Sequence, residues 1–514
     1  MVDPREHEQQ THSLRDDSVK QNLKGDWLNF FLLLLLYTMQ GLPLGISMVL
    51  PITLQSKNNT TYHEQALLSF TNLPFSFKLL LAPLVDAIYV QKLGRRKSWL
   101  IPVQYILGAT LVYTATNIDE LLPETGKANI IVLTFVFFII NLLAATQDIT
   151  VDGWALTMLK RKNVGYASTC NSAGQTAGVL IGSTVPILLT SEKFCNEYLR
   201  AIPGIGGIVT MKWILYSLGV LFVLITTLIA IFKKEKDIKL EDNNLKLNIV
   251  QTYKLMWDIL MLPSIQIFVL ALLTIKIGFA TTDVTTLKLI DAGVSKENIT
   301  ITNTVLMGVN IIITLIASKY TTGKKSMIIL VKSFLIRLTL NIPFAIFVFY
   351  TPQWMEYNRT ENISMYYLYA TFIILLSMQQ VVSNIMFVCT MAVFSQKSDP
   401  RFGSTYMTLL NTFANLGNML SNATAFGIID ILTFKRSSFD PENKLPMLNC
   451  LKKNKGDCEV DGYYIEVALF SILGIVWYVI FKNILKNLQY RSISHWTVNV
   501  NRRNPTTENS YSLE

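Results

Sequence analysis

The sequence has few charged residues for its length. Only 16% of its 514 residues are Asp, Glu, Lys or Arg, while 51% are hydrophobic. A soluble globular chain carries about a quarter charged residues, so the deficit excludes an ordinary water-soluble fold. The formal net charge is +10, but the cations lie in short loops between apolar runs. We therefore interpret them as signals of membrane topology and expect no nucleic-acid partner.

Histidine is also scarce, and its positions argue against catalysis. His7, His12, His63 and His495 all lie outside the long apolar runs, which disfavours a membrane-embedded acyltransferase with a histidine base. The sequence lacks a glycine-rich phosphate loop followed by lysine, so an ATP-driven pump is disfavoured. It also lacks the Cys/His spacing of a metal site. We expect no enzyme, no cofactor and no metal, with energy supplied by a gradient or by exchange.

Long apolar runs dominate the rest of the chain. Each covers about 20 residues or more, the length that a helix needs to cross the hydrocarbon core. Alternating strands of about ten residues, the signature of a membrane barrel, are missing. The pattern predicts an all-α membrane protein with twelve transmembrane helices, at residues 27–50, 66–90, 98–117, 128–149, 165–190, 211–232, 258–281, 299–318, 327–350, 364–394, 404–431 and 463–485.

Basic residues gather in alternate loops, which indicates the orientation. Positive loops stay in the cytosol. The basic set is Lys92, Arg95, Arg96, Lys97, Lys160, Arg161, Lys162, Lys233, Lys234, Lys236, Lys239, Lys324, Lys325, Lys397 and Arg401. We expect both tails, residues 1–26 and 486–514, to be cytosolic. The loop 432–462 departs from the rule because it contains Lys452, Lys453 and Lys455.

Glycosylation motifs and cysteines agree with this orientation. Asn58, Asn298, Asn358 and Asn362 each begin an Asn-x-Ser/Thr motif on the non-cytosolic side, where glycosylation takes place. Cys450 and Cys458 share one loop on that side, and we expect them to form a disulfide in an oxidising lumen. A free thiol pair is the alternative.

The fifth and eleventh runs resemble each other. Tyr166, Asn171 and Gln175 in one correspond to Tyr406, Asn411 and Asn415 in the other. This repeat predicts two six-helix halves, residues 27–232 and 258–485, joined by a cytosolic linker over 233–257. Asn171 and Gln175 are four residues apart and share a helix face, as do Asn411 and Asn415. These faces either line a central cavity or bind the helices together.

Three cations lie inside predicted spans. They are Lys78, Lys276 and Arg337. A buried cation is costly, so it usually faces a cavity or a partner. Only Asp283 is a nearby carboxylate in the sequence, and three cations favour an anionic solute. Structural pairing or snorkelling is the alternative, and the ninth helix, which contains Arg337, is expected to be peripheral.

Carboxylates mark the cytosolic ends of the second and fourth spans. Asp86 precedes the Arg95–Arg96 cluster, and Asp148 and Asp152 share one helix face. We expect these carboxylates to pair with the cytosolic basic loops and act as a conformational latch that gates transport. Proton coupling, in which Asp283 could join them, is the alternative.

Several runs resemble a known family. They are GLPLG at 41–45, LGRRKSWL at 93–100, AATQDITVDGWALTML at 144–159, NVGYASTCNSAGQTAG at 163–178 and TYMTLLN at 405–411. They are similar to the acetyl-coenzyme A transporter family of the major facilitator superfamily, over nearly the whole chain. The resemblance implies transport of acetyl-CoA from the cytosol into the endoplasmic reticulum, where it would supply luminal acetylation.

The resemblance also suggests roles for the residues named above. Lys78, Lys276 and Arg337 would offset the phosphates of acetyl-CoA. The repeat residues Tyr166, Asn171, Gln175, Tyr406, Asn411 and Asn415 would bind its adenine or pantetheine amides. CoA is a candidate counter-substrate, and monomer and homodimer both remain open. The main rival is a proton-coupled carrier of a peptide, sugar or cell-wall fragment; a membrane receptor or scaffold is a weaker one because the loops are short.

Overall fold

The protein is helical along most of its length. The computed structural model describes residues 23–56, 69–123, 129–202, 204–235, 248–291, 294, 296–321, 325–361, 366–432, 434–435, 458–460 and 462–498. The first half contains α2 (Trp27–Ser56), η2 (Ser69–Asn72), α4 (Leu73–Ser76), α5 (Lys78–Ala87), α6 (Lys97–Leu121), α7 (Ile130–Met158), η3 (Arg161–Asn163), α8 (Tyr166–Thr190), α9 (Glu192–Phe194), η4 (Cys195–Leu199) and α10 (Met211–Phe232).

The second half repeats this succession of long helices. It contains α11 (Ile249–Leu260), α12 (Pro263–Thr274), η5 (Ile277–Phe279), α13 (Thr282–Asp291), α14 (Lys296–Thr321), α15 (Ser326–Thr339), α16 (Asn341–Glu361), α17 (Tyr366–Lys397), η6 (Pro400–Phe402), α18 (Gly403–Leu432), α19 (Gly462–Tyr490) and η7 (Ile493–His495). A short antiparallel pair, β1 (Phe434–Lys435) with β2 (Cys458–Val460), lies between α18 and α19.

Each predicted span has a helical counterpart. Among the described residues, eight helical segments are long and apolar enough to cross a membrane by length and composition. They are α2, α7, α8, α10, α12–α13, α15–α16, α17 and α19. The α4–α5 pair, α6, α14 and α18 fill the four remaining positions. The all-α prediction is therefore confirmed. The domain boundaries stay predictions, and α11 begins inside the predicted linker.

Three of the spans are interrupted, which the apolar runs do not reveal. The second span breaks at Phe77, and the ninth changes from α15 to α16 at Leu340. The seventh changes from α12 through η5 to α13, with Lys276 at the break. Broken membrane helices are tolerated where protein or a wet cavity satisfies the freed backbone groups.

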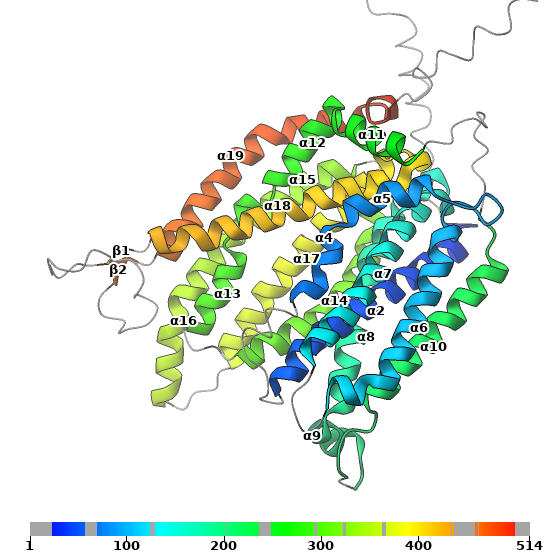
Figure 1. The fold of residues 1–514 in the computed structure, drawn as a ribbon. Helices are drawn as coiled ribbons and strands as arrows, with labels where there is room; N and C mark the ends of the chain where they lie inside the picture. Colours follow the sequence, from blue (N-terminus) through cyan, green and yellow to red (C-terminus); the bar gives the residue numbers. More distant parts are fainter. Residues whose placement is uncertain are drawn as a thin grey trace, which may run out of the picture.

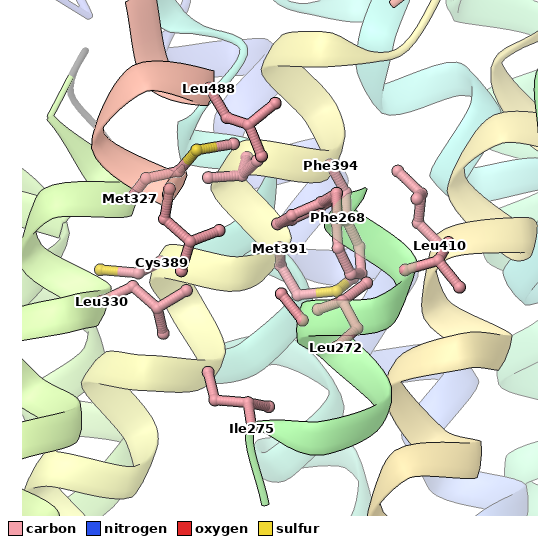
Figure 2. Close-up of a cluster of buried hydrophobic side chains, with 14 of the residues drawn as sticks. Phe268, Leu272, Ile275, Met327, Leu330, Cys389, Met391, Phe394, Leu410 and Leu488 are labelled. Atoms are coloured by element: carbon pink, nitrogen blue, oxygen red, sulfur yellow. The ribbon is translucent and has the colours of Figure 1, made fainter. Parts of the chain in front are cut away.

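Each half has its own hydrophobic core. One cluster joins α2, α6, α7, α8 and α10 around Leu36 and Phe222. A second joins α12, α15, α17, α18 and α19, and Figure 2 shows Phe268, Phe394 and Leu410 meeting there. In Figure 1 the helices of the first half gather on the right and most of those of the second on the left, with α18 reaching across toward α5 and α7. The two cores are thus largely separate, although Leu156 of α7 and Val164 belong to the second.

The first and fifth helices of each half pack through a glycine. A Cβ atom added to Gly178 of α8 would lie 2.1 Å from the carbonyl oxygen of Thr38 in α2. In the second half, a Cβ at Gly417 of α18 would lie 2.4 Å from the carbonyl oxygen of Leu272 in α12. The same close helix pair in both halves agrees with the repeat seen in the sequence. Small residues at such contacts let helix backbones approach closely in a membrane.

We expect Gly178→Ala to destabilise the protein by about 1–3 kcal/mol, because overpacking a close contact costs that much. The measurement is the thermal midpoint of the detergent-purified protein. Gly427→Ala is the matched control, since a Cβ there meets nothing within 4 Å. Equal midpoints for both variants would contradict the tight α2–α8 contact.

Candidate functional site

The second half encloses a polar cavity of about 190 Å³. Its walls come from the broken seventh span and from α15, α17 and α18. The lining residues are Lys276, Phe279, Thr282, Arg337, Gln379, Gln380, Ser383, Met386, Asn418 and Asn422. A smaller cavity of about 30 Å³ shares Thr282, Arg337 and Gln379 with it. Amides and hydroxyls thus surround two cations.

Arg337 is buried and held by neutral groups. Only 4% of its surface is exposed. Its Nε donates to Ser383 Oγ at 3.2 Å and its Nη2 to Thr282 Oγ1 at 2.8 Å. The guanidinium carbon lies 5.1 Å from the ring centroid of Phe279. Arg337 therefore points into the cavity, contrary to the expectation that the ninth helix is peripheral.

Lys276 lines the same cavity from the break after α12. Within the part of the chain that the structure describes, its ammonium group has neither a hydrogen bond nor an ion pair, and it lies within electrostatic range of Arg337. The side chain of Asp283 in α13 lies outside the described residues. Two cations that repel each other and have no described acidic partner form a site suited to an anion.

Lys78, the third predicted cation, lies elsewhere. It forms an ion pair with Asp148 of α7, and its ammonium lies 4.8 Å from the ring centroid of Phe75. The paired carboxylate neutralises it, and Lys78 is not among the residues that line the cavity. The set of three free cations expected from the sequence is therefore reduced to two.

The repeat residues do not line the cavity either. Tyr166 packs edge to face on Phe30, and the Tyr406 hydroxyl donates to the Trp496 carbonyl oxygen. Asn171 donates to Asp152 at 3.4 Å. Gln175 and Asn411 are half-buried, and Asn415 is exposed. In this conformation, Tyr166, Asn171, Gln175, Tyr406, Asn411 and Asn415 all lie outside the cavity lining, and a role for them in binding the solute stays a prediction.

Four amides that sequence reasoning missed take their place. Gln379 and Gln380 of α17 and Asn418 and Asn422 of α18 line the cavity. The two asparagines are four residues apart and share a helix face, and each lies seven residues, or about two helical turns, beyond Asn411 and Asn415 respectively. The adjacent glutamines inside an apolar run were a signal that could have identified α17.

A hydrogen-bonded latch joins the two halves at one end of the bundle. Arg96 Nη1 lies 2.5 Å from Asp86 Oδ1 and donates to Ser404 Oγ at 2.6 Å. The amide and hydroxyl of Thr405 donate to Asp86 Oδ2 at 2.8 and 2.7 Å. Arg95 adds a bond to the carbonyl oxygen of Arg401. Asp86, Arg95 and Arg96 thus tie the first half to the start of α18, and this set is called the latch below.

Asp148 and Asp152 do not contribute to this latch. Both are buried within the first half, where Asp148 accepts from Gln40 and Lys78, and Asp152 accepts from Tyr37. Their partners are on α2 and α5 rather than in the basic loops. The expected pairing of these two carboxylates with cytosolic loops is therefore wrong in this conformation.

The predicted modification sites stay predictions. Asn58, Asn362 and Cys450 lie outside the described residues. Asn298 in α14, Asn358 in α16 and Cys458 in β2 have described backbones, while their side chains are outside what the structure describes.

Two successive sets of long apolar helices, the second of which contains a polar cavity, are the architecture of a membrane transporter of the major facilitator type. A solved structure of the major facilitator FucP in an outward conformation has the same fold, with a TM-score of 0.55 and 14% sequence identity over 88% of this chain and 98% of that one. The chain also matches the family described as acetyl-coenzyme A transporter 1 over residues 29–246, 237–350 and 334–498. It belongs to that family.

Relatives of similar length occur in fungi. An uncharacterized protein of Schizosaccharomyces pombe is 27% identical over 95% of this chain and 93% of its own length. An uncharacterized membrane protein of Saccharomyces cerevisiae is 27% identical over 92% of this chain and 98% of its own. The transporter AmpG 1 of Rickettsia prowazekii is 27% identical over a shorter stretch, 29% of this chain and 33% of its own.

Weakening the latch should open the end that it closes. We expect Arg96→Gln to raise the rate of thiol labelling at Thr408→Cys about tenfold. The variant should lose about 1.4 kcal/mol of the free energy that favours the closed arrangement, and that loss corresponds to a factor of ten. Thr408 is buried one turn beyond Ser404. Lys92→Gln, an exposed cation of the same loop, is the control. An unchanged labelling rate would show that Arg96 does not keep this end shut.

Proposed function

We propose that the protein carries acetyl-CoA across the endoplasmic reticulum membrane by alternating access, with its phosphates bound by Lys276 and Arg337. The observation that carries the proposal is the cavity itself: two cations without a described acidic partner, inside a chain of the acetyl-coenzyme A transporter family. Arginine binds phosphate through two parallel hydrogen bonds, and lysine adds a point charge.

The neutral lining fits the rest of the nucleotide. Gln379, Gln380, Asn418 and Asn422 can donate to and accept from a base or an amide. Drug-sized ligands occupy pockets of about 300–1,000 Å³, so the cavity of about 190 Å³ takes only the phosphate-bearing part. The remainder would extend into the space between the halves.

The position of the latch indicates which end of the carrier is closed in this conformation. If the positive loops are cytosolic, as the sequence predicts, the latch closes the cytosolic end in this conformation. Acetyl-CoA would enter when the latch opens and leave toward the lumen when it reforms. CoA moving in the opposite direction would return the carrier without an ATP-consuming step.

Replacing either cavity cation should reduce uptake. We expect Lys276→Gln and Arg337→Gln each to lower the uptake of radiolabelled acetyl-CoA by reconstituted protein at least tenfold. Each variant loses a charge-assisted bond of about 1.5–3 kcal/mol to phosphate. Lys332→Gln is the matched control, since Lys332 is an exposed cation on the same helix. Detergent-solution monodispersity checks that the variants fold.

The identity of the solute is tested by competition. Excess CoA should inhibit acetyl-CoA uptake strongly, while pantetheine, which has no phosphate, should inhibit it weakly. Full uptake by both cation variants would remove these residues from the binding site. No acetyl-CoA uptake by the wild-type protein, with uptake of a neutral peptide or sugar instead, would replace the proposed solute with that of the rival carrier.

A further inference from the structure

A cluster of buried polar side chains in the first half belongs neither to the cavity nor to the latch. It lies where α2, α5, α7 and α8 meet, and we call it the carboxylate cluster. Its members are Tyr37 and Gln40 of α2, Lys78 of α5, Asp148 and Asp152 of α7, and Asn171 of α8. All six are buried residues, each less than one-tenth exposed as a whole.

The charges of the carboxylate cluster do not balance. Lys78 and Asp148 form an ion pair and cancel. Asp152, one helical turn further along α7, is 1% exposed and contacts the Tyr37 hydroxyl at 2.7 Å and the Asn171 amide at 3.4 Å. No cation pairs with it among the described residues. A buried carboxylate without a counter-ion is expensive at membrane depth, and binding a proton removes that cost.

The hydrogen bonds of the cluster are also unbalanced. Both donors to Asp152 reach the same atom, Oδ1, and the described residues supply no donor to Oδ2. Gln40 donates to Asp148, but its own carbonyl oxygen Oε1 is buried without a partner. The described cluster therefore has more hydrogen-bond acceptor atoms than donors to fill them. A proton on a carboxyl oxygen would supply an additional donor.

The surroundings favour a proton over a metal cation. The ammonium of Lys78 lies within the cluster, and the guanidinium of Arg96 borders Gly153, where an added Cβ would lie 2.8 Å from Arg96 Cζ. The charged or titratable groups around Asp152 are thus Tyr37, Lys78, Asp148 and, further off, Arg96. A metal ion would be repelled by the two cations and would need several oxygen ligands. A proton needs only one carboxyl oxygen.

Hydrogen bonds, together with two pairs of residues adjacent in the chain, connect the carboxylate cluster to the cavity. Asn171 donates to Asp152, and the next residue, Ser172, donates to Asn384 of α17 at 3.0 Å and lies 3.5 Å from Thr314 of α14. These contacts cross from one half to the other. Ser383, beside Asn384, accepts from Arg337 in the cavity. The route is contiguous, so a rearrangement of the Asn171–Ser172 segment would be felt at both sites.

We propose that Asp152 is a proton-binding residue and that its protonation is coupled to solute transport through the Asn171–Ser172 segment. The proton binds Oδ2 from one side of the membrane. It leaves to the other side after the halves have moved. No bond other than O–H forms or breaks. The coupling rests on the proposed function for the identity of the solute, whereas the proton site itself does not.

The proton site is tested without any solute. We expect infrared spectra of the reconstituted wild-type protein to show the C=O stretch of a buried protonated carboxylic acid at neutral pH. The band should disappear in Asp152→Asn and change frequency in Asp152→Glu. Asp119→Asn is the control, because Asp119 is an exposed carboxylate near Lys212. A band that is absent from the wild type or unchanged in Asp152→Asn overturns the proposal.

Coupling is tested with a transmembrane pH gradient. For wild-type protein we expect the gradient to change net acetyl-CoA uptake at least fivefold relative to uptake at equal pH on both sides of the membrane. In Ser172→Ala the infrared band should remain and the effect of the gradient should fall. If net acetyl-CoA uptake by the wild-type protein is measurable but insensitive to the gradient, coupling is wrong and the solute is right. If neither exchange nor uptake occurs while the band is present, the proposed solute is wrong and the proton site stands.

Discussion

Inside a bilayer, a charged side chain has only the rest of the protein to neutralise it, and the structure meets this constraint in three ways. Lys78 is neutralised by Asp148 within the first half. Asp86 and Arg96 neutralise each other in the latch. Lys276 and Arg337 have no described acidic partner and share a polar cavity. Ion pairs hold the helices in place, and the two cations without a described acidic partner indicate where an anion binds.

Much of the helical framework could be predicted because the membrane fixes the length of a spanning helix. The breaks at Phe77, around Lys276 and at Leu340 could not. Each run stays apolar on both sides of its break, and the single cation near the break does not by itself predict one. A break depends on whether neighbouring helices satisfy the freed backbone groups. The interruption beside Lys276 matters most, because it places that side chain on the cavity wall.

The candidate site was predicted in part. Lys276 and Arg337 stood out because cations are rare in apolar runs, and both line the cavity. Lys78 stood out for the same reason, but its partner Asp148 lies 70 residues away in sequence, so the pairing appears only after folding. The amides at Asn171 and Asn411 were chosen from the repeat, which indicates shared fold but not which turn of a helix meets the cavity. In α18 the lining residues Asn418 and Asn422 lie two turns beyond the repeat residues.

The glycine contact between α2 and α8 limits how the first half can respond to a change of charge. With Gly178 against the backbone of Thr38, α8 has little room to slide along α2 or to turn about its own axis without a steric clash. A rearrangement that starts beside Asn171 would then be transmitted to Ser172 as a tilt of the whole helix pair. The α2–α8 pair would then move as one rigid unit, and its length would set how far the two bundles part.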